Sequence, residues 1–248
     1  MLGLILTSAL FYILWTTPFK KVAISHYSGV VAWIIHGMIC YNNLFDKSGW
    51  MLNIPNSILL VSWLAVLVVL IFKLTSQWIK IPITFFVLSS FLLIKNQQTT
   101  LSYKEFSWQL DLHISLSMLA YAILVVATLF AISLWVHIKK IKNSQFDGNN
   151  IMSIMDEEKK LFQLIMLGWL ILTTSLLSGV IFIDNFMAQH LGHKVVFSLL
   201  AWLTFGLLIL GRLSKGWRGE KLIILTIVGM FALATGYLGS KIVMEWIL

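Results

Sequence analysis

The chain has 248 residues, of which 59% are apolar and only 11% are charged, and its formal net charge is +8. A soluble domain of this size would carry about 25% charged residues, so the composition excludes an ordinary soluble protein. The positive charge lies between apolar blocks, and no basic stripe with interleaved aromatic residues is present, so no nucleic-acid partner is expected.

The apolar residues are gathered in blocks of about 18 or more, the length at which a helix crosses a hydrocarbon core. Helices are the open-chain structures that satisfy their own backbone groups in lipid. We therefore predict an all-α polytopic integral membrane protein with about eight transmembrane helices, forming a single domain over residues 1–248. The predicted spans are residues 2–17, 27–44, 55–73, 78–95, 112–137, 161–182, 194–213 and 222–244.

The first block lacks the basic start and the small-residue cleavage site of a signal peptide, so we predict that it is retained as a span. With the N-terminus outside, 13 of the 18 lysines and arginines fall on the cytoplasmic side, and both termini are then outside. The one long loop, residues 138–160, is predicted to be a cytoplasmic linker that starts a helix near Ser153, a residue type suited to an N-cap.

Histidines are the chemically informative residues of these spans. His36 is ten residues into the second predicted span, which at ~1.5 Å per residue places it about 15 Å deep, near the midplane. An ionisable side chain at that depth is either a satisfied structural group or a functional one. His113 opens the fifth span at its outer end, and His190 and His193 lie in the outer connection DNFMAQHLGHK.

Neutral imidazoles are metal ligands, so three histidines at one membrane face indicate a possible site for iron. The spacing from His190 to His193 allows both rings to lie on one side of a helical turn, but no glutamate accompanies them as in zinc hydrolases. Haem needs only one or two axial imidazoles and an apolar wall, for which Trp108 and Trp202 are candidates, with ordinary packing as the alternative. We predict haem as the cofactor, with His113 and His193 as candidate axial ligands of its iron. No nucleophile–base pair is evident, so an independent catalytic turnover is not expected.

Two stretches of the chain resemble known proteins. Residues 108–134, WQLDLHISLSMLAYAILVVATLFAISL, resemble the histidine-bearing helix of the cytochrome c assembly (CcmC/CcsA) membrane family. Residues 193–212, HKVVFSLLAWLTFGLLILGR, resemble the helix that follows the tryptophan-rich haem-handling loop of those proteins. From WIIHGMIC to GWRG and GYLGSKIV, the chain is most similar to the small eight-span branch of YpjD- or HemX-like proteins.

The resemblance implies haem binding by outer histidines, matched here by His113, with an intramembrane histidine matched by His36. It also implies a bacterial inner membrane and a role in cytochrome c assembly or haem homeostasis. The second outer histidine of the assembly proteins is replaced by Leu210-Gly211-Arg212, and the tryptophan-rich motif ending in Trp-Asp is missing. We therefore expect a protein that holds or passes haem without full haem-ligase activity, and hypothesise that His190 or His193 serves as an axial ligand.

Two other functions are compatible with the sequence. One is a non-catalytic membrane partner that regulates a haem-synthesis enzyme through residues 138–160. The other is a small-solute permease, although the spans show neither a repeat between halves nor a charged residue at the midplane. The expected partners are membrane lipid, haem and other cytochrome assembly or haem-synthesis proteins.

Overall fold

The fold is all-helical, as the sequence predicts. A computed structural model describes residues 1–17, 22–46, 49–51, 53–95, 108–142, 148–182 and 192–239. Apart from the helices, the described part contains one small hairpin, in which β1 (Phe45–Asp46) pairs antiparallel with β2 (Gly49–Trp50). The chain divides into two compact units, Met1–Asp111 and Leu112–Leu248. The single domain over the whole chain stays a prediction.

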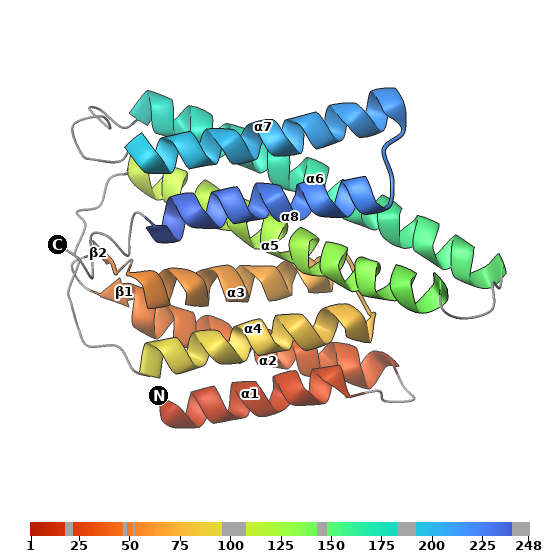
Figure 1. Cartoon of the computed structure of the whole chain (residues 1–248). Helices are drawn as coiled ribbons and strands as arrows, with labels where there is room; N and C mark the ends of the chain where they lie inside the picture. The colour runs from red at the N-terminus through yellow and green to blue at the C-terminus, as the bar shows by residue number, and fades with distance from the viewer. Residues whose placement is uncertain are drawn as a thin grey trace. The chain divides into compact units, whose positions relative to one another are not determined.

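The first unit is a bundle of four helices (Figure 1). They are α1 (Leu2–Thr16), α2 (Val22–Leu44), α3 (Ile54–Ile71) and α4 (Gln77–Lys95). Each of α1 and α3 packs against both α2 and α4. Small polar side chains join the helices: the Ser8 hydroxyl donates to the Ala32 carbonyl at 3.2 Å, and the hydroxyls of Ser62 and Ser90 are 3.0 Å apart. Such residues let apolar helices approach closely while their polar atoms stay satisfied.

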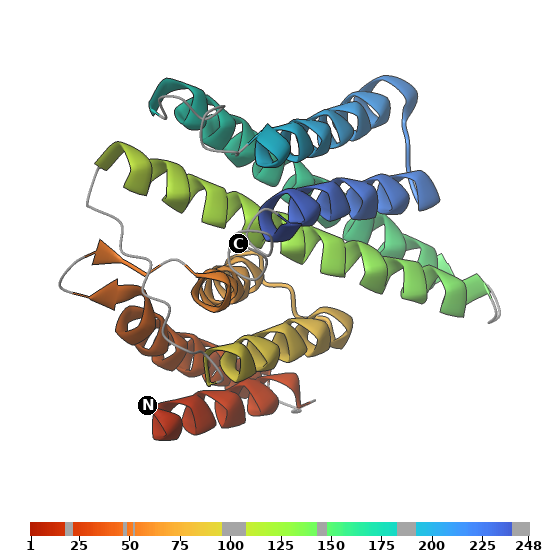
Figure 2. The ribbon, with the colours of Figure 1, turned by 60° about the vertical axis from the view of Figure 1, so that its left-hand side comes forward.

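The connection between α2 and α3 contains the hairpin, whose two strands are the small arrows in Figure 2, and asparagines fix it. Asn53 is the N-cap of α3, and its side chain accepts from the backbone N–H of Asn56 at 2.9 Å. The Asn56 amide donates in turn to the carbonyls of Asn43 and Met51 at 2.9 and 2.8 Å. The end of α2 and the start of α3 are therefore held together, at one end of the bundle.

The second unit contains the longer helices. They are α5 (Trp108–Lys142, which begins at the boundary), α6 (Gly148–Phe182), α7 (Gly192–Lys215) and α8 (Glu220–Ala234), followed by the π-helical turn η1 (Thr235–Gly239). Helix α7 packs against α6 and α8. Glycines allow close approach: a Cβ on Gly168 of α6 would lie 2.7 Å from Leu124 of α5, and one on Gly229 of α8 would lie 2.8 Å from Phe205 of α7.

Six of the described helices, α3 to α8, contain segments that are long and apolar enough to cross a membrane. This confirms the predicted multi-pass membrane protein. Helix α1 is apolar but has only 15 residues. Helix α2 has 23 residues but is not among the six, and its sequence includes His26, His36, Asn42 and Asn43.

The prediction that residues 138–160 form a linker with a helix starting near Ser153 is wrong. Helix α5 continues to Lys142 and α6 begins at Gly148, so Ser153 lies inside α6 and is not its N-cap. Lysine and glutamate are good helix formers, so helices that leave a hydrocarbon core can continue through a charged segment. Near this end Nδ1 of His137 in α5 lies 3.2 Å from Oε2 of Glu157 in α6, within hydrogen-bonding distance.

Candidate functional site

His113 is the predicted site residue whose ring is most clearly oriented. It lies in the second turn of α5, and its Nδ1 is 3.0 Å from the Ser175 carbonyl and 3.0 Å from the Ser178 hydroxyl, both on α6. A carbonyl can only accept a hydrogen bond, so Nδ1 carries the ring proton in the neutral imidazole. The lone pair of the neutral ring is then on Nε2.

The sequence of α6 explains this contact. Ser175, Ser178 and Gly179 are spaced so that they share one face of the helix. The Ser178 hydroxyl donates to the Ser175 carbonyl at 2.7 Å, and a Cβ on Gly179 would lie 3.0 Å from His113 Cε1. Ser117, one turn after His113, binds the Ser175 hydroxyl at 2.7 Å. We call these four α6 and α5 residues the serine–glycine cradle of His113.

His36 lies in a different environment, inside the first unit. Its side chain is 0% exposed, and Nδ1 is 3.1 Å from the Tyr12 hydroxyl. The rings of Tyr12 and Phe91 pack edge-on against the imidazole, with centroids 5.9 and 4.8 Å away. Its Nε2 is buried and makes no hydrogen bond within the described part of the chain. In this conformation the ring is enclosed by protein, and a porphyrin could reach it only if neighbouring side chains moved.

The two predicted aromatic wall residues differ in their surroundings. Trp108 is the first residue of α5 and is 66% exposed. Trp202 of α7 stacks on Trp169 of α6 with centroids 5.6 Å apart, and its Nε1 donates to Thr173 at 2.8 Å. Trp169 in turn donates to the Trp202 carbonyl at 3.0 Å, so this pair fastens α6 to α7.

The remaining predicted ligands are only partly covered. His190 lies outside the described residues, and His193 is described only as a backbone position in the first turn of α7. Within the described ranges, no group of three or more His, Cys, Asp or Glu side chains is placed to hold a metal ion. His36 belongs to the first unit and His113 to the second, so the surroundings of each are described within its own unit. The role of cofactor ligand or contact stays a prediction for all six residues: His36, His113, His190, His193, Trp108 and Trp202.

The sequence did not reveal the partners of the two histidines. Tyr12 is in another predicted span from His36, and its hydroxyl contact depends on how α1 packs against α2. Ser175, Ser178 and Gly179 were recognisable as a small-residue face of α6, but not as the residues that orient His113. Periodicity identifies the face of a helix and leaves open which residue of another helix meets it.

These features define a multi-pass membrane protein with an oriented histidine at the start of a long helix. The chain belongs to the cytochrome C assembly protein family, whose model matches residues 25–248.

Curated relatives agree with this assignment. The chain is 29% identical to inner membrane protein YpjD of Escherichia coli (strain K12), over 89% of this chain and 86% of that protein. It is also 29% identical to the cytochrome c biogenesis protein CcsA of Chlamydomonas reinhardtii, over 55% of this chain and 38% of CcsA. The CcsA of Prochlorococcus marinus (strain NATL1A) is 26% identical, over 55% of this chain and 52% of CcsA. No solved structure matches the chain. A multi-pass protein of the inner membrane is thus established.

Proposed function

We propose that this protein holds or passes haem in cytochrome c assembly or haem homeostasis, with His113 as an axial ligand. The observation that carries the proposal is the hydrogen bond from His113 Nδ1 to the Ser175 carbonyl. A histidine that ligates a metal usually donates its other ring N–H to a carbonyl or carboxylate, which fixes the tautomer and makes the ligand more basic. Membership in the cytochrome c assembly family supports haem as the group that is bound.

The three α6 residues of the cradle have distinct parts in this function. Ser175 holds the proton on Nδ1 through its carbonyl, and Ser178 limits rotation of the ring. Gly179 leaves room for the imidazole against α6. Bound haem would supply an iron that accepts an imidazole nitrogen. His113 Nε2 fits that requirement, whereas the enclosed ring of His36 does not in this conformation.

The second axial ligand is proposed to be His193, which lies in the first turn of α7, or His190. The stretch Leu210-Gly211-Arg212 has no histidine to match the second one of the assembly proteins, and their tryptophan-rich motif ending in Trp-Asp is missing. These differences favour retention or transfer of haem over complete ligation to an apocytochrome. Other cytochrome assembly or haem-synthesis proteins are the proposed partners.

A visible spectrum of the purified protein tests the proposal. We expect a Soret band near 400 nm in the wild-type protein or after addition of haem, and its loss or a clear shift in His113→Ala. His26→Ala is the matched control. His26 is an exposed histidine in the first turns of α2, and the hairpin follows the opposite end of this helix. Haem content that is the same in wild type, His113→Ala and His26→Ala would reject His113 as a ligand.

A further inference from the structure

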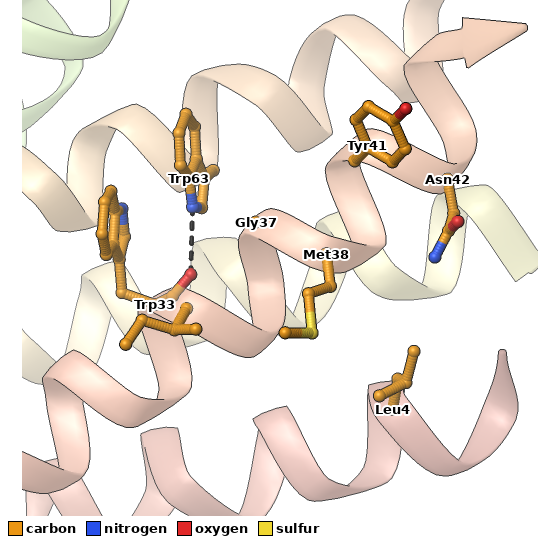
Figure 3. Close-up of a pocket in the computed structure, with 8 residues that line it drawn as sticks. Leu4, Trp33, Gly37, Met38, Tyr41, Asn42 and Trp63 are labelled. Atoms are coloured by element: carbon orange, nitrogen blue, oxygen red, sulfur yellow. Dashed lines mark hydrogen bonds between the residues drawn. The ribbon is translucent and has the colours of Figure 1, made fainter.

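An apolar groove of about 490 Å³ lies on the first unit, between α1, α2 and α3 (Figure 3). Helix α1 contributes Leu4, and α3 contributes Trp63. The rest of the lining comes from α2, including Ile34, Gly37 and Met38. None of the histidines discussed above lines it, so the groove shares no histidine with the proposed haem site.

The groove has a rigid floor. Trp33 and Trp63 stack with ring centroids 5.0 Å apart and planes within 6°, and Trp63 Nε1 donates to the Trp33 carbonyl at 3.0 Å. Gly37 lets the indole approach, since a Cβ there would lie 3.1 Å from Trp63 Nε1. The aromatic floor is thus held by stacking and by a hydrogen bond.

The groove has the length of one leaflet. Trp63 is the tenth residue of the 18-residue span α3, which places it near the middle of the membrane. Asn42 lies at the other end of the groove, beside the connection in which Asn56 binds the Asn43 carbonyl. From Trp33 to Asn42 the helix rises about 14 Å at ~1.5 Å per residue. This is close to half of a hydrocarbon core that is about 30 Å thick.

The chemistry of the groove changes along this length. Ile34 and Met38 are 49% and 53% exposed, so the middle of the groove is open at its side and apolar. The side chains of Tyr41 and Asn42 supply hydrogen-bonding groups at the end near the hairpin, and Figure 3 shows Leu4 facing Asn42 from α1. An apolar recess surrounded by hydrocarbon does not hold water stably, because water there lacks polar partners.

We propose that this groove binds one acyl chain of a membrane phospholipid. The chain lies along Gly37 and Met38 with its methyl end near the Trp33–Trp63 stack. The ester region of the lipid lies at Tyr41 and Asn42. The groove therefore holds a lipid in one leaflet at a defined site, in contrast to the rest of the lipid-facing surface.

Photolabelling tests this proposal in the intact protein. The probe is a phosphatidylcholine with a diazirine near the end of one acyl chain, mixed into the lipid of nanodiscs that contain the full chain. After irradiation, labelled peptides are mapped by mass spectrometry. We expect residues 33–38 to be labelled several-fold more strongly than Leu10, which is 60% exposed on α1 and does not line the groove.

Two variants separate a site from general contact with lipid. Met38→Trp fills the groove and is expected to abolish the excess labelling, whereas Leu10→Trp adds the same side chain elsewhere and is expected to leave it unchanged. If Met38→Trp does not fold, Ile34→Trp takes its place, and the wild-type labelling pattern is decisive by itself. Labelling spread evenly over the exposed residues of α1 and α2, or unaffected by filling the groove, would overturn the proposal. Haem binding is measured separately and does not affect this outcome.

Discussion

At the scale of single residues, the orientation of His113 depends on groups of the neighbouring helix α6. The Ser175 carbonyl sets which ring nitrogen carries the proton, and the missing side chain of Gly179 sets how close the ring lies to α6. Both act through the imidazole, so we regard them as positioning residues. Their effect should appear in the properties of the bound group more than in the stability of the helices.

Gly179→Ala tests this view of the cradle. The added methyl group would lie 3.0 Å from His113 Cε1, so the ring must shift by a few tenths of an ångström. Alanine favours a helix over glycine by about 1 kcal/mol, so a loss of helix propensity cannot explain a weaker site. We expect lower haem retention and a shifted Soret band, measured by titration of purified protein with haem.

Gly206→Ala is the control for that substitution. Gly206 lies in α7, where a Cβ would be 3.4 Å from Trp169 Nε1, which is an ordinary contact. Its spectrum and haem affinity should match those of the wild type. Equal behaviour of the two variants would show that contact between Gly179 and His113 has no part in the site.

At the scale of whole elements, the sequence identified the apolar part of each helix better than its ends. Helices α5 and α6 each have 35 residues and continue well past their apolar segments, where the sequence predicted a linker. Hydropathy identifies segments that are apolar enough to lie in the lipid bilayer. It does not identify a charged helix that continues outside the membrane. The boundaries of α1, α3 and α4 were close to prediction because these helices end where their apolar runs end.

The connection between α7 and α8 is stabilised by a buried carboxylate from α6. Glu158 is 7% exposed, and its Oε1 accepts from the Gly219 N–H at 2.8 Å. Gly219 is the N-cap residue of α8 and has φ +58°, so the backbone there cannot easily take another residue. We expect Glu158→Ala to destabilise the protein by about 1–3 kcal/mol, because it leaves a polar backbone group without its partner. A fall in the thermal unfolding temperature in detergent measures this loss.

Two further variants separate hydrogen bonding from charge. Glu158→Gln keeps an oxygen acceptor and should be less destabilising than Glu158→Ala. Glu157→Ala removes the neighbouring, more exposed carboxylate that pairs with His137, and should cost less than about 1 kcal/mol. An unfolding temperature for Glu158→Ala no lower than that of Glu157→Ala would contradict this role.

At the scale of the whole molecule, the fold class followed from the lengths and spacing of the apolar blocks. The division into two units did not, because it depends on how residues from different helices interlock. The same limit applies to the candidate site. His113 stood out because an ionisable residue opens a span, but its contact with Ser175 joins positions 62 residues apart. Such a pairing follows from the crossing of α5 and α6, which no local pattern in either helix specifies.

The predicted orientation of the chain in the membrane can be tested by labelling single introduced cysteines. Cys40 is the single cysteine and is only 5% exposed, so it gives little background with a thiol reagent. Gly3→Cys places a thiol near the N-terminus, where a side chain meets no other atom within 4 Å. Ser214→Cys places an exposed thiol near the end of α7, on the predicted cytoplasmic side.

We expect a membrane-impermeant maleimide to label Gly3→Cys in intact spheroplasts and to label Ser214→Cys only after the membrane is opened. The reason is that 13 of the 18 basic residues would otherwise lie on the outer side, against the positive-inside rule. The start of α5 is on the same side as the N-terminus if four spans precede it. A reversed labelling pattern would therefore place His113 on the cytoplasmic side, and a haem site at the outer membrane face would no longer be tenable.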